Sequence, residues 1–203
     1  MMMGIASAYA LRKKDIMTAI LLSSAVTKRA VSMTCLAAVM LAGIATSGAA
    51  QITIVALGTS NTRGRGLPPQ QSYPAQLQAM LRAKGENVQV INMGVNGDTT
   101  AGMLARLNSV PSGTRLVLLE YSPVNEAKGG ITNTAANLAA IQGRLAARNI
   151  KSIVVTGIVQ SEHRAARSTG NLISTPAGPH LNATAYGDVA AQVLPQVEAA
   201  VGR

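Results

Sequence analysis

The stretch Ile52–Gly66, ITIVALGTSNTRGRG, joins a strongly apolar run to a polar, glycine-rich one. Its first six residues are aliphatic or β-branched, which is typical of a buried strand. The sequence turns polar after Gly58, and Ser60 follows at once. A serine at the end of a buried strand often serves a turn, but it is also a common nucleophile in covalent catalysis. The rest of the sequence has to decide between these two roles.

Strand-like and helix-like segments alternate along the rest of the chain. We expect strands at 52–57, 88–95, 114–121 and 152–159, and helices at 72–85, 98–107, 133–149 and about 182–201. The segment 160–179 has no clear period, although 171–174 is a candidate fifth strand, and Pro195 should kink or interrupt the last helix. Apolar strands that alternate with helices predict a parallel sheet covered on both faces. The sequence therefore predicts one α/β domain, a three-layer sandwich around a parallel sheet of four to five strands.

Residues 1–50 have the order of an export signal. VTKR at 26–29 supplies positive charge, 30–45 is apolar, and TSGAA at 46–50 offers small residues for cleavage. Met17 is an alternative start, and an uncleaved anchor is the alternative to cleavage, although the apolar part is shorter than the roughly 20 residues of a membrane span. We expect a leader at 1–50 and an exported domain at 51–203, periplasmic or secreted, with no membrane span after cleavage.

Composition narrows the classes of partner. The 203 residues carry a formal net charge of +10, but the basic residues are spread singly and aromatic residues make up 2%. This pattern argues against nucleic-acid binding, which needs clustered charge. The single cysteine, Cys35, lies in the leader, so the domain has no disulfide. With two histidines and no ligand-spaced cluster, we expect neither a metal nor a cofactor.

Polar residues with chemical potential follow the predicted strands, where parallel sheets bind their ligands. Ser60 follows the first strand, Gly97 the second and Asn125 the third, and His180 precedes the last helix. A serine, a histidine, backbone N–H groups and an amide are the components of an acyl-transfer site. Each also has a structural alternative: Ser60 and Asn125 as turn residues, Gly97 as a positive-φ position and His180 as a surface residue.

Four stretches of the sequence resemble the SGNH (GDSL-type) hydrolase family. They are VALGTSNTRGRG (55–66), INMGVNGDTTAGMLARL (91–107), LLEYSPVNEAKGG (118–130) and AGPHLNATAYGDVAAQVLP (177–195). The resemblance is strongest to the secreted branch that is similar to lysophospholipases, thioesterases and arylesterases. It implies a flavodoxin-like fold, with Ser60 as the nucleophile and His180 as the general base. It also implies an oxyanion hole formed by Ser60, Gly97 and Asn125.

The sequence departs from the family pattern at three places. Thr59 replaces the aspartate before the serine, and Pro123 and Val124 replace small residues beside Asn125. Ala177 stands where the family has the aspartate that orients the histidine. The expected triad is therefore reduced to a pair unless another carboxylate reaches the histidine. Glu162 is the nearest candidate along the chain.

Two functional hypotheses follow from these residues. The first is an exported serine hydrolase that cleaves esters or thioesters of small acyl groups through a Ser60 acyl-enzyme. Its partner would be a small-molecule ester, and we expect a monomer. The alternative is a catalytically decayed relative that binds an acyl or glycan ligand, with a structural cell-envelope protein as a weaker third option. Of the other polar residues, we expect Asp98 to cap a helix and His163 to be a surface residue near a helix start.

Overall fold

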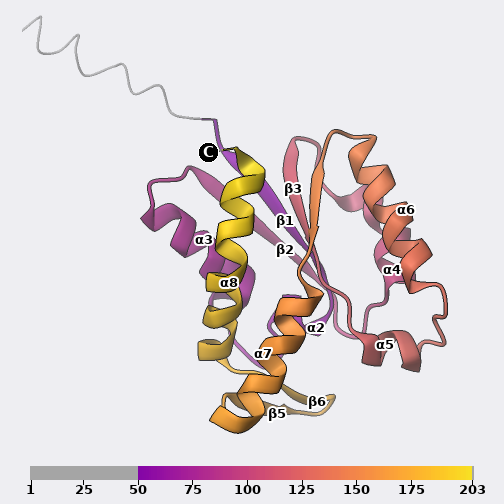
Figure 1. The fold of residues 1–203 in the computed structure, drawn as a ribbon, viewed down its shortest axis with the longest axis vertical. Helices are drawn as coiled ribbons and strands as arrows, with labels where there is room; N and C mark the ends of the chain where they lie inside the picture. The colour runs from indigo at the N-terminus through magenta and orange to yellow at the C-terminus, as the bar shows by residue number, and fades with distance from the viewer. Residues whose placement is uncertain (1–49, 203) are drawn as a thin grey trace, which may run out of the picture. The chain divides into compact units, whose positions relative to one another are not determined.

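A parallel four-stranded sheet lies at the centre of the fold, in the order β2-β1-β3-β4 (Figure 1). The computed structural model describes residues 50–202, so the predicted leader lies outside the described residues except for Ala50. The strands of this sheet are β1 (Ile52–Gly58), β2 (Val88–Gly94), β3 (Thr114–Leu119) and β4 (Lys151–Val154). The helices are α2 (Ser60–Arg63), α3 (Tyr73–Ala83), α4 (Thr100–Ala105), α5 (Pro123–Lys128), α6 (Thr134–Ala146), α7 (Thr156–Thr169) and α8 (Ala183–Val201), with short 3-10 helices at Pro69–Gln71 and Leu107–Ser109.

Alternate residues of the central strands face two different helical layers. Ile54 and Ala56 of β1 pack against α3, α7 and α8, whereas Val55 and Leu57 pack against α4 and α6. Burial on both sides explains why β1 and β3 each contain four consecutive apolar residues with no exposed surface, Ile54–Leu57 and Leu116–Leu119. The predicted three-layer α/β fold with a parallel sheet is confirmed.

The register of the sheet brings the strand ends to one edge. Gly58 at the end of β1 lies opposite Gly94 at the end of β2, and Leu119 at the end of β3 lies opposite both Leu57 and Val154. The segments that follow β1, β2 and β3 therefore leave the sheet side by side.

The strand predicted at 152–159 is wrong in its second half. β4 ends at Val154, and α7 begins at Thr156. An apolar run of this length does not distinguish a buried strand from a buried helix. The residues from Val159 onwards do follow a helical period. Val159, Glu162 and Ala166, which are three or four positions apart, share the buried face of α7.

The segment 160–179, expected to be irregular, contains most of α7 and a β-hairpin. The candidate fifth strand at 171–174 exists as β5 (Leu172–Thr175), but it pairs antiparallel with β6 (Gly178–Leu181) in a separate two-stranded sheet. Pro195 does not interrupt α8, which continues to Val201. Val193 and Val197 are fully buried on either side of this proline, so core packing offsets the missing backbone N–H.

Gly94 allows the closest approach between β2 and α2. A Cβ atom at this position would overlap the backbone nitrogen of Arg63 in α2. The side-chain amide of Asn92 fastens the same contact, because its Nδ2 donates to the carbonyl oxygen of Thr62 at 2.7 Å. A residue without a side chain at the end of β2 therefore sets the position of α2, whose first residue is Ser60.

We expect Gly94→Ala to lower the free energy of unfolding by about 1–3 kcal/mol. The added methyl group would overlap the backbone of α2, which cannot move away as a flexible side chain could. Gly143→Ala is the matched control, since Gly143 lies inside α6 with no atom within 4 Å of an added Cβ. That variant should gain about 0.5–1 kcal/mol from helix propensity. Urea unfolding of both variants measures the difference, and equal effects would contradict the close approach.

Candidate active site

The structure brings Ser60 and His180 into hydrogen-bond contact across 120 residues of sequence. Ser60 is the first residue of α2, directly after β1, and His180 lies on β6. The distance between Ser60 Oγ and His180 Nε2 is 2.9 Å, and both residues are buried, with 9% and 7% exposure. A serine hydroxyl that donates to an imidazole at this distance has the geometry of a nucleophile and its general base.

The other ring nitrogen of His180 contacts two uncharged oxygens. Nδ1 lies 3.0 Å from the carbonyl oxygen of Gly178 and 3.1 Å from Thr175 Oγ1. Since a carbonyl oxygen can only accept, Nδ1 carries the proton in this contact and Nε2 is left as the acceptor for Ser60. Thr175 Oγ1 also donates to the Gly178 carbonyl at 2.7 Å and so helps to fix this turn. A peptide carbonyl thus occupies the position of an acid.

Glu162 does not take the place of the missing acid. It is buried on α7, and its Oε2 accepts from Gln192 Nε2 at 3.3 Å on α8. Ala177, the position of the family's aspartate, is exposed at the tip of the hairpin. Its backbone N–H donates to Thr175 Oγ1 at 3.3 Å, one contact away from the imidazole.

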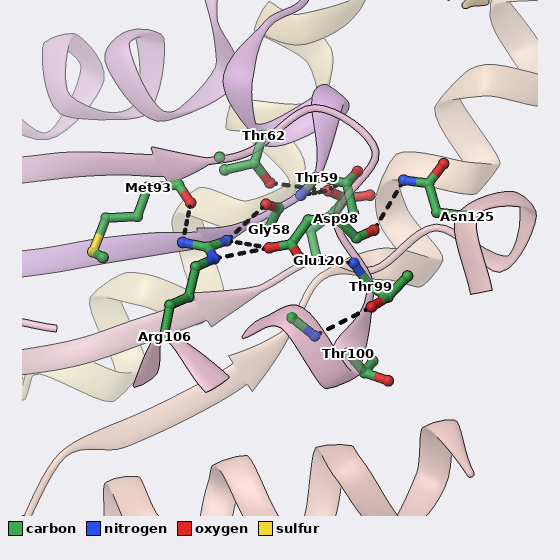
Figure 2. A network of polar contacts seen from close by, with 12 residues as sticks. Gly58, Thr59, Thr62, Met93, Asp98, Thr99, Thr100, Arg106, Glu120 and Asn125 are labelled. Atoms are coloured by element: carbon green, nitrogen blue, oxygen red, sulfur yellow. Dashed lines mark hydrogen bonds and ion pairs between the residues drawn. The ribbon is translucent and has the colours of Figure 1, made fainter. Parts of the chain in front are cut away.

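The expected oxyanion-hole residues lie on the segments that leave β1, β2 and β3. Ser60 is the first residue of a helix, so its N–H has no intrahelical acceptor. Gly97 has a φ of +77°, which favours glycine, and its N–H has no hydrogen-bond partner among residues 50–202. Asn125 lies on α5, and its Nδ2 donates to the backbone carbonyl of Asp98 at 3.0 Å (Figure 2). Two backbone N–H groups and one amide thus lie at the strand edge that carries Ser60.

Arg106 connects these segments, as Figure 2 shows. Its guanidinium donates to the carbonyl oxygens of Gly58 and Met93, at 3.1 and 2.9 Å, and pairs with Asp98 at 2.6 Å. The prediction that Asp98 caps a helix is wrong. The cap of α4 is Thr99, whose Oγ1 accepts from the Gly102 N–H at 3.2 Å, because the Asp98 carboxylate is held by Arg106.

Glu120, which the sequence did not single out, is buried directly beneath the serine turn. Its Oε2 accepts from the backbone N–H of Thr59 at 2.9 Å and from the hydroxyls of Thr59 and Thr62 at 2.8 and 3.0 Å. The exposed fraction of Glu120 is 1%. A charged residue straight after four buried apolar residues of β3 was the sequence signal for it. Thr59, found where the family has an aspartate, is therefore a donor to a carboxylate that comes from another strand.

A second buried carboxylate holds the opposite side of the site. Glu126 on α5 accepts from the N–H and hydroxyl of Thr100, both at 2.7 Å, and from the hydroxyl of Thr134 at 2.6 Å. It joins the start of α4 to α5 and α6, so it fixes the helix that carries Asn125.

His163 lies next to the site, and the prediction of a surface residue near a helix start is wrong. It sits half-buried in the middle of α7, and its Nε2 lies 2.8 Å from Asn61 Oδ1, beside Ser60. Burial lowers the pKa of His163 below its usual value, and the neighbouring His180 and Arg167 lower it further. The error arose because α7 was not recognised as a helix.

The described residues 50–202 contain no group of three or more His, Cys, Asp or Glu side chains placed to hold a metal ion. Within the same residues, no helix is both long and apolar enough to cross a membrane.

Comparison with known proteins identifies the family. The model of the GDSL-like lipase/acylhydrolase family matches residues 56–202, so the chain belongs to this family. The chain is 41% identical over 73 residues to the esterase TesA of Pseudomonas aeruginosa, and 41% identical over 54 residues to an arylesterase of Vibrio mimicus. These matches cover 36% and 27% of this chain, and 34% and 27% of the two relatives.

A solved structure supports the same fold. The psychrotrophic esterase EstA from Pseudoalteromonas sp. aligns with a TM-score of 0.60 and 18% identity, over 74% of this chain and 99% of EstA. At this identity the likeness concerns the fold alone.

The lowered pKa of His163 predicts a pH-dependent stability. Between its folded pKa and about 6.5 the unfolded chain binds more protons, so this residue's contribution is complete above about pH 6.5 and is lost as the pH falls through the folded pKa. We expect His163→Gln, which keeps a hydrogen-bond donor, to lose less stability than the wild type between pH 7 and 5. Urea unfolding at both pH values measures the free energy of unfolding of the two proteins. The difference between them at pH 7 gives the effect of the contacts that the substitution removes. Parallel acid dependence of the two proteins would contradict the assignment.

Proposed function

We propose that this chain is a serine hydrolase that cleaves carboxylic esters or thioesters of small acyl groups through an acyl-enzyme on Ser60. The observation that carries the proposal is the 2.9 Å contact between Ser60 Oγ and His180 Nε2 at the carboxyl edge of the sheet. Membership of the GDSL-like lipase/acylhydrolase family and the esterase names of the partial matches support it.

The proposed reaction uses each group in turn. Ser60 Oγ attacks the ester carbonyl carbon while His180 Nε2 takes the hydroxyl proton. The N–H groups of Ser60 and Gly97 and the amide of Asn125 donate to the oxygen that becomes negative. When the tetrahedral intermediate collapses, His180 returns the proton to the leaving oxygen. A water then attacks the acyl-enzyme by the same route, and Ser60 is released with the acid product.

The carbonyl of Gly178 can perform one function of the missing triad acid but not the other. As an acceptor for Nδ1–H it holds the ring in the tautomer that leaves Nε2 free to take the serine proton. As an uncharged group it stabilises the imidazolium of the transition state less than a carboxylate would. We therefore expect hydrolysis that depends on Ser60 but is slower than in a complete triad.

Exposed apolar side chains near the proposed oxyanion hole suggest where the acyl group lies. Val95 is 46% exposed between the end of β2 and Gly97, and Val124 is 60% exposed beside Asn125. With few apolar side chains there to cover it, a short acyl group fits this surface better than a long chain.

The second candidate is a ligand-binding protein with a decayed site. The specific observation in its favour is that both hydrogen-bond partners of His180 Nδ1 are uncharged. Trapping of an acyl-enzyme separates the two candidates, because a binding protein would form none.

We also propose that the domain is exported after removal of the leader. The order of charge, apolar stretch and small residues in 26–50 supports this. Intact-mass measurement of protein recovered from outside the cytoplasm should give a chain that begins near Ala50 or Gln51. A chain that retains the leader in the membrane would contradict the proposal.

Wild-type protein should hydrolyse p-nitrophenyl acetate and become acylated on Ser60. We expect Ser60→Ala to abolish the acyl-enzyme seen by mass spectrometry and to reduce turnover to background. Ser168→Ala is the matched control, because the Ser168 hydroxyl contacts only the Ala165 carbonyl on the exposed side of α7. It should leave activity intact, whereas equal rates for wild type and Ser60→Ala would favour the binding protein.

Restoring the family's acid should raise the rate. We expect Ala177→Asp to increase kcat on an activated ester by roughly 10–10³-fold, because the new carboxylate would accept from Nδ1 and stabilise the imidazolium. Glu162→Gln is the control and should change kcat little, since Glu162 contacts Gln192 and not the imidazole. If Ala177→Asp leaves kcat unchanged, the Gly178 carbonyl is already a sufficient partner. A loss in Glu162→Gln would show that the acid function lies on α7.

A further inference from the structure

Four arginines near Ser60 and His163 form what we call the basic rim: Arg63, Arg65, Arg164 and Arg167. Three are exposed and Arg65 is half-buried, yet none of their guanidinium groups has a hydrogen bond or ion pair within residues 50–202. The donors of these four guanidinium groups are therefore free to bind an acceptor that the described residues do not supply.

The basic rim borders the side of the site that carries His180. The backbone N–H of Arg65 donates to the carbonyl of Ser60 at 3.0 Å, and the next residue, Gly66, lies against the side chains of Ile173 and Thr175 in β5. β5 pairs with β6, which bears His180. Arg65 thus lies on the segment between Ser60 and the hairpin that bears His180.

Arg167 reaches the same side from α7, which lies beside α2 in Figure 1. It follows His163 by four residues, so the two side chains share one face of the helix. That face contacts α2, because His163 Nε2 lies 2.8 Å from Asn61 Oδ1. The charge of Arg167 also contributes to the lowered pKa of His163, as expected for two groups on one face.

Among residues 50–202, no carboxylate forms an ion pair with the basic rim. Glu120, Glu126 and Glu162 are buried, and each already accepts hydrogen bonds from neighbouring side chains. The basic rim therefore offers four unpaired guanidinium groups near the side of the site that carries His180.

The path of the catalytic proton indicates which half of an ester would lie beside the basic rim. His180 must return its proton to the leaving oxygen, so the alcohol half leaves on the side of the hairpin and α7. The acyl carbonyl points the other way, towards Gly97 and Asn125. The basic rim therefore lies on the side of the alcohol half. The exposed Val95 and Val124 lie close in sequence to Gly97 and Asn125, on the side of the carbonyl oxygen.

We propose that the alcohol half of the substrate carries an anionic group, a carboxylate or a phosphate, which Arg65 and Arg167 bind while His180 protonates the leaving oxygen. This inference rests on the proposed ester hydrolysis and adds the substrate class. Guanidinium groups suit both anions, because their N–H donors form paired hydrogen bonds with carboxylate and phosphate oxygens.

A matched pair of esters tests the charge and its place. The anionic ester is 4-acetoxybenzoate and the neutral one is its methyl ester, so both carry the same acetyl group. We expect kcat/KM to favour the anionic ester by about 10-fold or more, and Arg65→Gln and Arg167→Gln each to reduce this ratio by about 3–10-fold, as for charge-assisted hydrogen bonds. The ratio should fall as salt is raised to 1 M, where screening is nearly complete.

Arg115→Gln is the matched control, because it removes the same charge from an exposed arginine near the start of β3, at the other end of the sheet. It should leave the ratio unchanged. The place of the charge is tested with p-nitrophenyl hemisuccinate and p-nitrophenyl butyrate, which differ only at the end of the acyl group. An equal or larger preference for the anionic acyl group would overturn the assignment to the alcohol half.

A binding measurement separates this inference from the proposed reaction. Calorimetry with Ser60→Ala and the product 4-hydroxybenzoate should detect binding that weakens in the added Arg65→Gln and Arg167→Gln variants. Binding without any hydrolysis by the wild type would sustain the anion site and refute the esterase. Ser60-dependent hydrolysis of both esters at equal efficiency would support the esterase and refute the anion site. Arginine-dependent sedimentation with phosphatidylglycerol vesicles, without discrimination between the esters, would assign the basic rim to a membrane surface and overturn the proposal.

Discussion

The guanidinium of Arg106 holds together the backbone segments on which the site is built. It binds carbonyls at the ends of two neighbouring strands, those of Gly58 and Met93, and it fixes the loop beyond them through Asp98. The carbonyl of Asp98 in turn accepts from Asn125, so the segment after β3 is placed by the same contact. A planar fork with several donors can serve these acceptors together, whereas the compact ammonium of a lysine could not. This one side chain therefore links the segments that carry Ser60, Gly97 and Asn125.

The acids of this domain support the backbone of the site rather than its histidine. Glu120 and Glu126 each gather hydrogen bonds from threonines on neighbouring segments, and both are nearly inaccessible to water. The imidazole of His180 instead contacts a neutral carbonyl, which stabilises the transition-state charge on the ring less than a carboxylate would. In the proposed complex an anionic substrate would bring into the site the negative charge that the hairpin lacks.

Much of the fold could be predicted because its strands carry a strong local signal. Four consecutive buried apolar residues in β1 and again in β3 specify a sheet covered on both faces. The same signal misled at 152–159, where Val159 belongs to a helix whose polar face begins only after the apolar run. The position of Ser60 was also predictable, because strand ends in a parallel sheet share one edge. His180 was expected beside it from the family resemblance, since β6, on which it lies, belongs to the separate hairpin. The contacts of Glu120 and Arg106 were not, since each depends on the distances between three segments that no local pattern encodes. His163 was misplaced for the simpler reason that its helix was missed.

The hairpin that bears His180 forms a small sheet of its own. Its two strands pair with each other and with no strand of the main sheet, and a two-stranded hairpin has little stability of its own. It is held to the domain by the burial of Leu181 in the core and by the contact of Ile173 and Thr175 with Gly66. Opening of this unit would carry the imidazole away from Ser60 while the four-stranded core stayed folded. The temperature range of the site therefore depends on how firmly the hairpin is held as well as on the stability of the four-stranded core.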